Sequence, residues 1–191
     1  MMSSPVSICN MALSHIKAGS INAMVDKTEQ ARQCGTFYDE ARQYVLRMAP
    51  WSFATKHQAL AQSEQEVMGW EYSYTKPQDC LMARNVYNES TIHKTKGEEF
   101  ILISNLLVCR ITPAYLEYTE DVEDTNRFDP SFRMAFSYKL AQLLAIPLTG
   151  DAKLSQNMIA LYQIEMDGAE LNNIREGRIK PKRSSKYIEG R

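Results

Sequence analysis

The stretch that decides the fold is residues 26–50, DKTEQARQCGTFYDEARQYVLRMAP. Apolar side chains recur there every three or four residues, the spacing that places them on one face of an α-helix. They are Ala31, Cys34, Tyr38, Ala41, Val45 and Met48, with Phe37 and Tyr44 beside them. Asp26 is placed to cap the helix, and Glu29 to complete a capping box. Pro50 disfavours helical geometry in the preceding residue and so ends the element.

A shorter helix is predicted before this stretch, starting at Ser4 and ending near Gly19. Serine is a good helix cap, and Pro5 occupies the first helical position, where proline is tolerated. One apolar stripe follows at helical spacing, formed by Cys9, Ala12, Leu13 and Ile16. We therefore predict that residues 1–60 form the N-terminal helical hairpin of the core.

A second helical pair is predicted near the other end, in residues 121–175. Asp129 and Pro130 open its first helix, and Pro147 and Gly150 are expected to end it. The apolar face of that helix comprises Phe132, Ala135, Phe136, Leu140, Leu143 and Leu144. Asp151 is expected to cap the last helix, which continues at helical spacing to about residue 174.

The middle of the chain, residues 61–120, has a different character and is rich in Tyr, Val, Ile, Leu and Thr in short runs. Such runs between turn residues predict strands. They cover Glu71–Thr75, Cys80–Tyr87, Ser90–Thr95, Glu99–Ile103, Leu106–Ile111 and Ala114–Thr119, with turns at Lys96–Glu98 and Ser104–Asn105. The predicted fold class is α+β, mainly α: a four-helix core with an inserted small antiparallel β-sheet.

The composition is that of an ordinary globular chain, with 44% hydrophobic and 24% charged residues. Apolar runs are far too short to span a bilayer, and the N-terminus lacks the pattern of a signal peptide, so we expect synthesis in the cytoplasm and no membrane partner. The four cysteines, Cys9, Cys34, Cys80 and Cys109, are widely spaced. No nucleophile, phosphate-binding or metal-ligand motif occurs. We therefore expect no metal, no cofactor and no enzymatic activity.

Several segments of the first 60 residues resemble the head-to-tail adaptor subunits of short-tailed bacteriophages, also called tail tubular protein A. The resemblance is carried by Ile8–His15, Glu29–Cys34, Tyr38–Arg42 and Arg47–Ala54. The family pattern reads approximately E-A-x-x-C, Y-D-x-A-R and P-W-x-F-A, and this chain departs from it where Gln30 separates Glu29 from Ala31. Its motif residues here are Cys34, Tyr38, Asp39, Arg42, Pro50, Trp51 and Phe53. The aromatic ones also suit a core, so the motif implies a shared fold rather than a reaction.

The resemblance implies a structural protein of the virion, at the junction of head and tail. Its subunits would form a ring of about twelve copies, bound to the portal protein and to the tail nozzle, tubular protein B. The ring would extend the channel for double-stranded DNA without reading its sequence. Such a family implies a C-terminal extension that docks on the portal, which places that role on Arg178, Lys180, Lys182, Arg183 and Lys186.

Charge is distributed unevenly. Residues 175–191 carry seven basic and two acidic side chains, a net charge of +5, whereas the other residues carry −6. We predict that the acidic residues Asp121, Glu123 and Asp124 of one subunit contact Arg32, Arg42, Arg47 or the basic tail of the next. Three alternatives stay open: a solvated terminus, a tail that binds nucleic acid, and a small enzyme with an unrecognised site.

Overall fold

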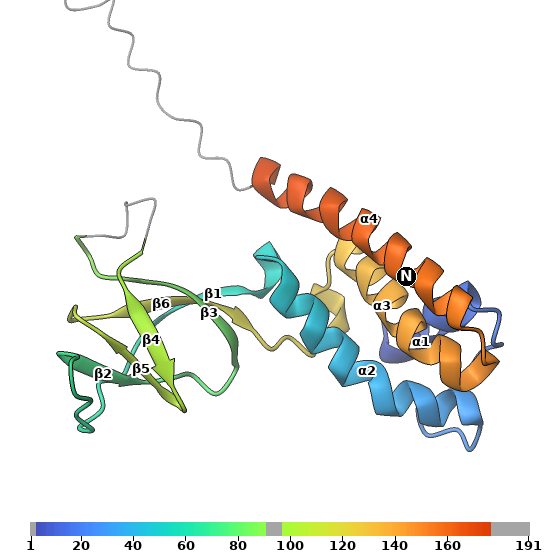
Figure 1. The fold of residues 1–191 in the computed structure, drawn as a ribbon, viewed down its shortest axis with the longest axis horizontal. Coiled ribbons are helices and arrows are strands. Elements are labelled where there is room, and N and C mark those ends of the chain that lie inside the picture. The colour runs from blue at the N-terminus through green and yellow to red at the C-terminus, as the bar shows by residue number, and fades with distance from the viewer. Residues whose placement is uncertain (1–2, 91–96, 177–191) are drawn as a thin grey trace, which may run out of the picture.

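The helices and the strands occupy two parts of the molecule that lie side by side in Figure 1. The computed structural model describes residues 3–90 and 97–176. The helical part, here called the body, consists of α1 (Pro5–His15), α2 (Glu29–Met48), α3 (Pro130–Thr149) and α4 (Ala152–Glu176). One hydrophobic core includes side chains from all four helices, which confirms the predicted four-helix core.

Helix α3 is the centre of the body because its apolar residues are not confined to one stripe. Both of its phenylalanines and two of its four leucines are fully buried, as are small residues on its other sides: Phe132, Ala135, Phe136, Ser137, Leu140, Ala141, Leu144 and Ala145. Helices α1, α2 and α4 each pack against it, whereas α1 and α2 make few contacts with each other. The predicted N-terminal hairpin is therefore two helices joined through α3.

Most of the predicted helix starts are confirmed. Ser4 caps α1 by accepting a hydrogen bond from the backbone N–H of Ser7, and Pro5 is the first helical residue. Asp129 caps α3 in the same way, with Pro130 following it. Asp151 accepts a hydrogen bond from the N–H of Leu154 at the start of α4. Short polar side chains thus satisfy N–H groups that have no partner within each helix.

Two predictions about helix ends are wrong. Thr28, not Asp26, caps α2 by accepting a hydrogen bond from the N–H of Ala31. The Asp26 carboxylate instead accepts hydrogen bonds from the N–H groups of Asn22 and Ala23 in the preceding loop. Pro147 does not end α3, which continues to Thr149. A proline removes one backbone hydrogen bond, a small loss so close to the end of a helix. The stop is Gly150, whose φ of 69° is the left-handed conformation that glycine adopts readily.

The strands form the β part, which contains two three-stranded antiparallel sheets where the sequence predicted one. The first sheet has the order β1 (Thr55–Ala59), β6 (Tyr115–Glu120), β3 (Cys80–Tyr87). The second has the order β2 (Tyr72–Thr75), β5 (Leu106–Cys109), β4 (Phe100–Ile103). Their facing sides share a small core that includes Tyr74, Val86, Leu107, Cys109, Leu116 and Tyr118.

Five of the predicted strands are confirmed to within a few residues, as is the hairpin turn at Ser104–Asn105. The strand predicted at Ser90–Thr95 falls mostly outside the described residues, as does Lys96 of the other turn. Strand β1 was not predicted, because its sequence TKHQA is polar and most of its side chains are exposed at a sheet edge. The β part therefore begins at Thr55, inside the range predicted to be helical.

Candidate interaction surfaces and the junction between the two parts

Two chain segments connect the body to the β part, and three arginines form hydrogen bonds at this connection. The first segment, residues 49–54, leads from α2 through the short helix η1 (Ser52–Ala54) to β1. The second, residues 121–129, leads from β6 through η2 (Thr125–Arg127) to α3. We call these two segments and the side chains that link them the junction.

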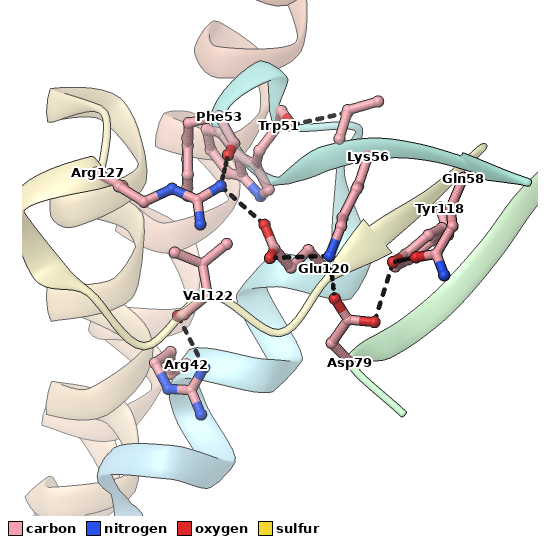
Figure 2. Close-up of polar contacts among 11 residues, drawn as sticks. Arg42, Trp51, Phe53, Lys56, Gln58, Asp79, Tyr118, Glu120, Val122 and Arg127 are labelled. Atoms are coloured by element: carbon pink, nitrogen blue, oxygen red, sulfur yellow. Dashed lines mark hydrogen bonds and ion pairs between the residues drawn. The ribbon is translucent and has the colours of Figure 1, made fainter. Parts of the chain in front are cut away.

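Arg42 is the buried anchor of the junction, with 2% of its surface exposed. It extends from α2 to the second segment, where its Nη1 donates to the carbonyl oxygen of Val122 at 2.9 Å (Figure 2). The same nitrogen also bonds the carboxylate of Asp121. The Arg42 Nε donates to Asp39 at 3.2 Å, and Gln43 donates to the other oxygen of Asp121. A guanidinium buried this deeply is stable only when its donors are partnered, which fixes α2 against this segment.

Two further arginines add to the junction, Arg84 from the first sheet and Arg127 from the second segment. Arg84 on β3 donates to the carbonyl of Ala49 at 2.6 Å and to the hydroxyl of Thr119 at 2.7 Å. Burial lowers its pKa. Arg127 donates to the carbonyl of Phe53 and to Glu120, both at 2.8 Å, as Figure 2 shows. Arg84 thus links the first sheet to the first segment, and Arg127 links the second segment to the first segment and to β6.

A polar cluster on the first sheet continues the junction. Lys56 on β1 lies between Asp79 and Glu120, and Tyr118 on β6 donates to Asp79 at 3.0 Å (Figure 2). The hydrogen bond to Asp79 raises the pKa of Lys56. Burial raises the pKa of Asp79, but the hydrogen bonds from Lys56 and Tyr118 outweigh it and leave this pKa below its usual value. Burial and the neighbouring Asp79 raise the pKa of Tyr118 to about 12.

These contacts correct part of the predicted subunit interface. Arg42 and Asp121 were expected to face different subunits, yet they bond each other within one chain, because α2 passes directly beside residue 121. The Asp124 carboxylate caps η2 through the N–H of Asn126. Arg32 is exposed and pairs with Glu29 one helical turn away. Arg47 and Glu123 are exposed, so these two remain candidates for contact with a neighbour.

The basic residues assigned to portal docking, Arg178, Lys180, Lys182, Arg183 and Lys186, lie outside the described residues. The predicted contact between the acidic residues and the basic tail therefore stays a prediction.

The family-motif residues serve the fold. Cys34, Tyr38 and Trp51 lie in the core of the body, and the indole N–H of Trp51 donates to the carbonyl of Val45 at 2.9 Å. Phe53 is half-buried against Trp51 and Phe132. The remaining motif positions are Asp39 and Arg42, which bond each other, and Pro50, which follows the extended cap of α2. The prediction that the aromatic residues are core residues is confirmed for Tyr38 and Trp51.

A groove of about 460 Å³ lies on the surface of the body, between the C-terminal end of α2, the middle of α4 and the part of α3 between them. Its walls include Tyr44, Met48, Lys139, Gln142, Ile159, Tyr162, Gln163 and Met166. Met48 was predicted to lie in the core stripe of α2, but it is 55% exposed. Val45 and Leu46 of the same helical turn are fully buried, whereas the Met48 side chain lines the groove instead of the core.

A second apolar surface lies on β4, at the edge of its sheet. Ile101, Leu102 and Ile103 are each more than 40% exposed. The opposite edge strand, β2, is covered by backbone hydrogen bonds with residues 61 and 63. Strand β4 has only β5 as a strand partner among the described residues. Sheet edges with exposed apolar residues favour contact with another chain.

The remaining reactive side chains have structural roles. Cys9 and Cys34 are buried together, and the hydrogen bond between their thiols raises the pKa of Cys9. His15 stacks on Tyr138 and lies 3.1 Å from the hydroxyl of Ser137, and burial lowers its pKa. Within residues 3–90 and 97–176, no group of three His, Cys, Asp or Glu side chains is placed to hold a metal ion.

Sequence signals for the groove were weak. Lys139 interrupts an apolar helix between Tyr138 and Leu140, which is a sign of a polar site at a helix surface. Tyr44 and Tyr162 looked like ordinary members of apolar stripes. Arg84 in the middle of a strand could have indicated the junction, but only the packing shows what it reaches.

No protein-family model matches the chain, and no curated protein matches it significantly. Among the described helices, none combines the length and the hydropathy that crossing a bilayer requires.

Proposed function

We propose that this chain is a structural subunit of a virion, a head-to-tail adaptor that assembles with copies of itself into a ring between the portal and the tail nozzle. The observation that carries the proposal is the role of the residues that resemble the adaptor family. Tyr38, Arg42 and Trp51 hold together the body and the junction, so the shared pattern maintains a shape. A ring depends on shape, because each subunit must present the same angle to both neighbours.

The junction supports the same function. Arg42 ties α2 to the second connecting segment, Arg84 ties the first sheet to the first segment, and Arg127 ties the two segments to each other, so the body and the β part keep one relative orientation. A subunit that transmits force during DNA passage needs such a connection. The body and the β part also carry different exposed apolar surfaces, the groove and β4, and a closed ring of identical subunits requires two different lateral surfaces.

The DNA channel follows from the ring. Outside residues 175–191 the chain carries a net charge of −6. Non-specific DNA binding strengthens with each phosphate that is neutralised, so an acidic wall lets DNA slide. The portal, the nozzle and about twelve copies are the partners that this proposal implies.

Negative-stain imaging of the purified chain mixed with its cognate portal tests the proposal. We expect an additional ring of density on the narrow end of the portal, with the rotational symmetry of the portal. The matched control is the Arg42→Met variant, which disturbs the junction and should reduce the occupancy of the ring. Portal particles that stay bare at saturating concentrations of the parent chain would rule the adaptor function out.

A further inference from the structure

The groove of the body contains a cation without an anionic partner. Lys139 comes from the middle of α3, and its ammonium lies 4.0 Å from the centre of the Tyr44 ring and 2.9 Å from the amide oxygen of Gln142. Burial lowers its pKa, as expected for a charge removed from water. Among the described residues, no carboxylate lies within ion-pair distance of Lys139, although Asp167 lines the same groove.

A second polar group of the groove also lacks a partner. The side chain of Tyr162 is 8% exposed, and its hydroxyl group makes no hydrogen bond with the described residues. A buried hydroxyl without a partner is destabilising, because it has lost its hydrogen bonds to water and gained none in return. The groove therefore combines a half-buried ammonium and an unpaired phenol with the apolar side chains of Met48, Ile159 and Met166. This chemistry fits a carboxylate that is followed by apolar residues.

The chain itself contains such a segment on β4. Glu99 is exposed and directly precedes Phe100–Ile103, where three apolar side chains are exposed. Strand β4 belongs to the β part, whereas the groove belongs to the body, and within one chain neither surface is covered by the other. The two surfaces complement each other in charge and in apolar character, so a second copy can satisfy both.

We infer that β4 of one subunit, with Glu99 facing Lys139 and Ile101 against the apolar wall, occupies the groove of a neighbouring subunit. This inference rests on the proposed function and names its lateral contact. The contact is heterologous, because the surface that each subunit offers differs from the one that it receives. Repeating it around an axis leaves no groove and no β4 edge exposed.

Chemical crosslinking between two cysteines tests the contact. Gln163→Cys places a thiol in the groove and Ile101→Cys places one on β4, while the four native cysteines are buried. A mixture of the two single variants, treated with a short bis-maleimide, should give covalent dimers that neither variant gives alone. A chain with both substitutions should give a ladder of longer oligomers. Thr75→Cys, an exposed position on the opposite edge of the same sheet, replaces Ile101→Cys in the control.

Charge reversal tests the proposed ion pair in the same assay. Lys139→Glu and Glu99→Lys should each lower the yield of the dimer about tenfold, and the combination of the two variants should restore it. Circular dichroism of each variant establishes that it folds. A yield no higher than that of the Thr75 control, or two reversals without mutual rescue, overturns the contact.

The outcome is separable from that of the proposed function. A ring on the portal without the covalent ladder rejects the groove contact and keeps the adaptor. A ladder with bare portals keeps the contact and rejects the adaptor. Dimers that do not extend into a ladder reject the heterologous geometry.

Discussion

The body and the β part of this molecule are stabilised to different degrees. In the described residues, the body buries 27 apolar side chains in one core, whereas the β part buries eight in a separate core. Burial of apolar surface is the main source of folding free energy, so the β part is expected to be the less stable region. It is also attached to the body, because Arg42, Arg84 and Arg127 each bond two or more groups at the junction. The small β part is therefore held in place by its junction with the body as well as by its own core.

The largest expected effect comes from removing a core side chain in each part. Phe136→Ala in α3 should lower the free energy of unfolding by about 4 kcal/mol, and Leu107→Ala in β5 by about 3 kcal/mol, because each leaves a cavity in a fully buried site. Urea unfolding measures both in a Trp51→Phe background, where circular dichroism reports the helices and the fluorescence of Trp70, between β1 and β2, reports the β part. Phe136→Ala should shift both signals, whereas Leu107→Ala should shift the Trp70 signal first. Coincident shifts in both variants would contradict two separate cores.

The next effect tests the junction. Arg42→Met should cost about 3 kcal/mol, since it leaves the Asp121 carboxylate and the carbonyl of Val122 without their buried partner. It should also separate the two urea transitions, because the β part loses its attachment to α2. Arg32→Met is the matched control: this arginine is exposed, pairs only with Glu29, and its loss should cost less than about 1 kcal/mol. Transitions that stay superimposed in Arg42→Met would show that the junction does not couple the parts.

The smallest effect concerns pH. The folded-state pKa of Asp79 lies below its usual value of 3.8, so the ionised form is favoured by folding. Its contribution to stability is complete above the unfolded pKa and is lost as pH falls through the folded pKa. Asp79 is partly exposed, so we expect less than about 1 kcal/mol. Asp79→Asn should flatten this part of the acid dependence of stability, measured by urea unfolding between neutral and acidic pH. If stability depends on pH equally in Asp79→Asn and in the parent chain, another carboxylate is responsible for this acid dependence.

Several features of the fold could be read from local sequence because they depend on nearest neighbours along the chain. Ser4, Asp129 and Asp151 cap their helices as predicted, and the stripe of Cys9, Ala12, Leu13 and Ile16 is buried as predicted. Capping and periodicity act over a few residues, so the sequence alone specifies them. Strand β1 was not predicted, because it is an exposed edge strand whose polar sequence lacks the alternation of apolar and polar residues that indicates a strand.

The candidate sites depended on contacts between distant residues. Arg42 and Asp121 are 79 residues apart, and nothing local distinguishes a buried arginine that pairs within the chain from one that faces a neighbour. Lys139, Tyr162 and Met48 come from three different helices, so only their packing creates the groove. The sequence by itself determined the helices, most of the strands and the α+β class. Tertiary structure decided which charges are paired within the chain and which polar groups remain available, because burial and pairing are properties of the assembled fold.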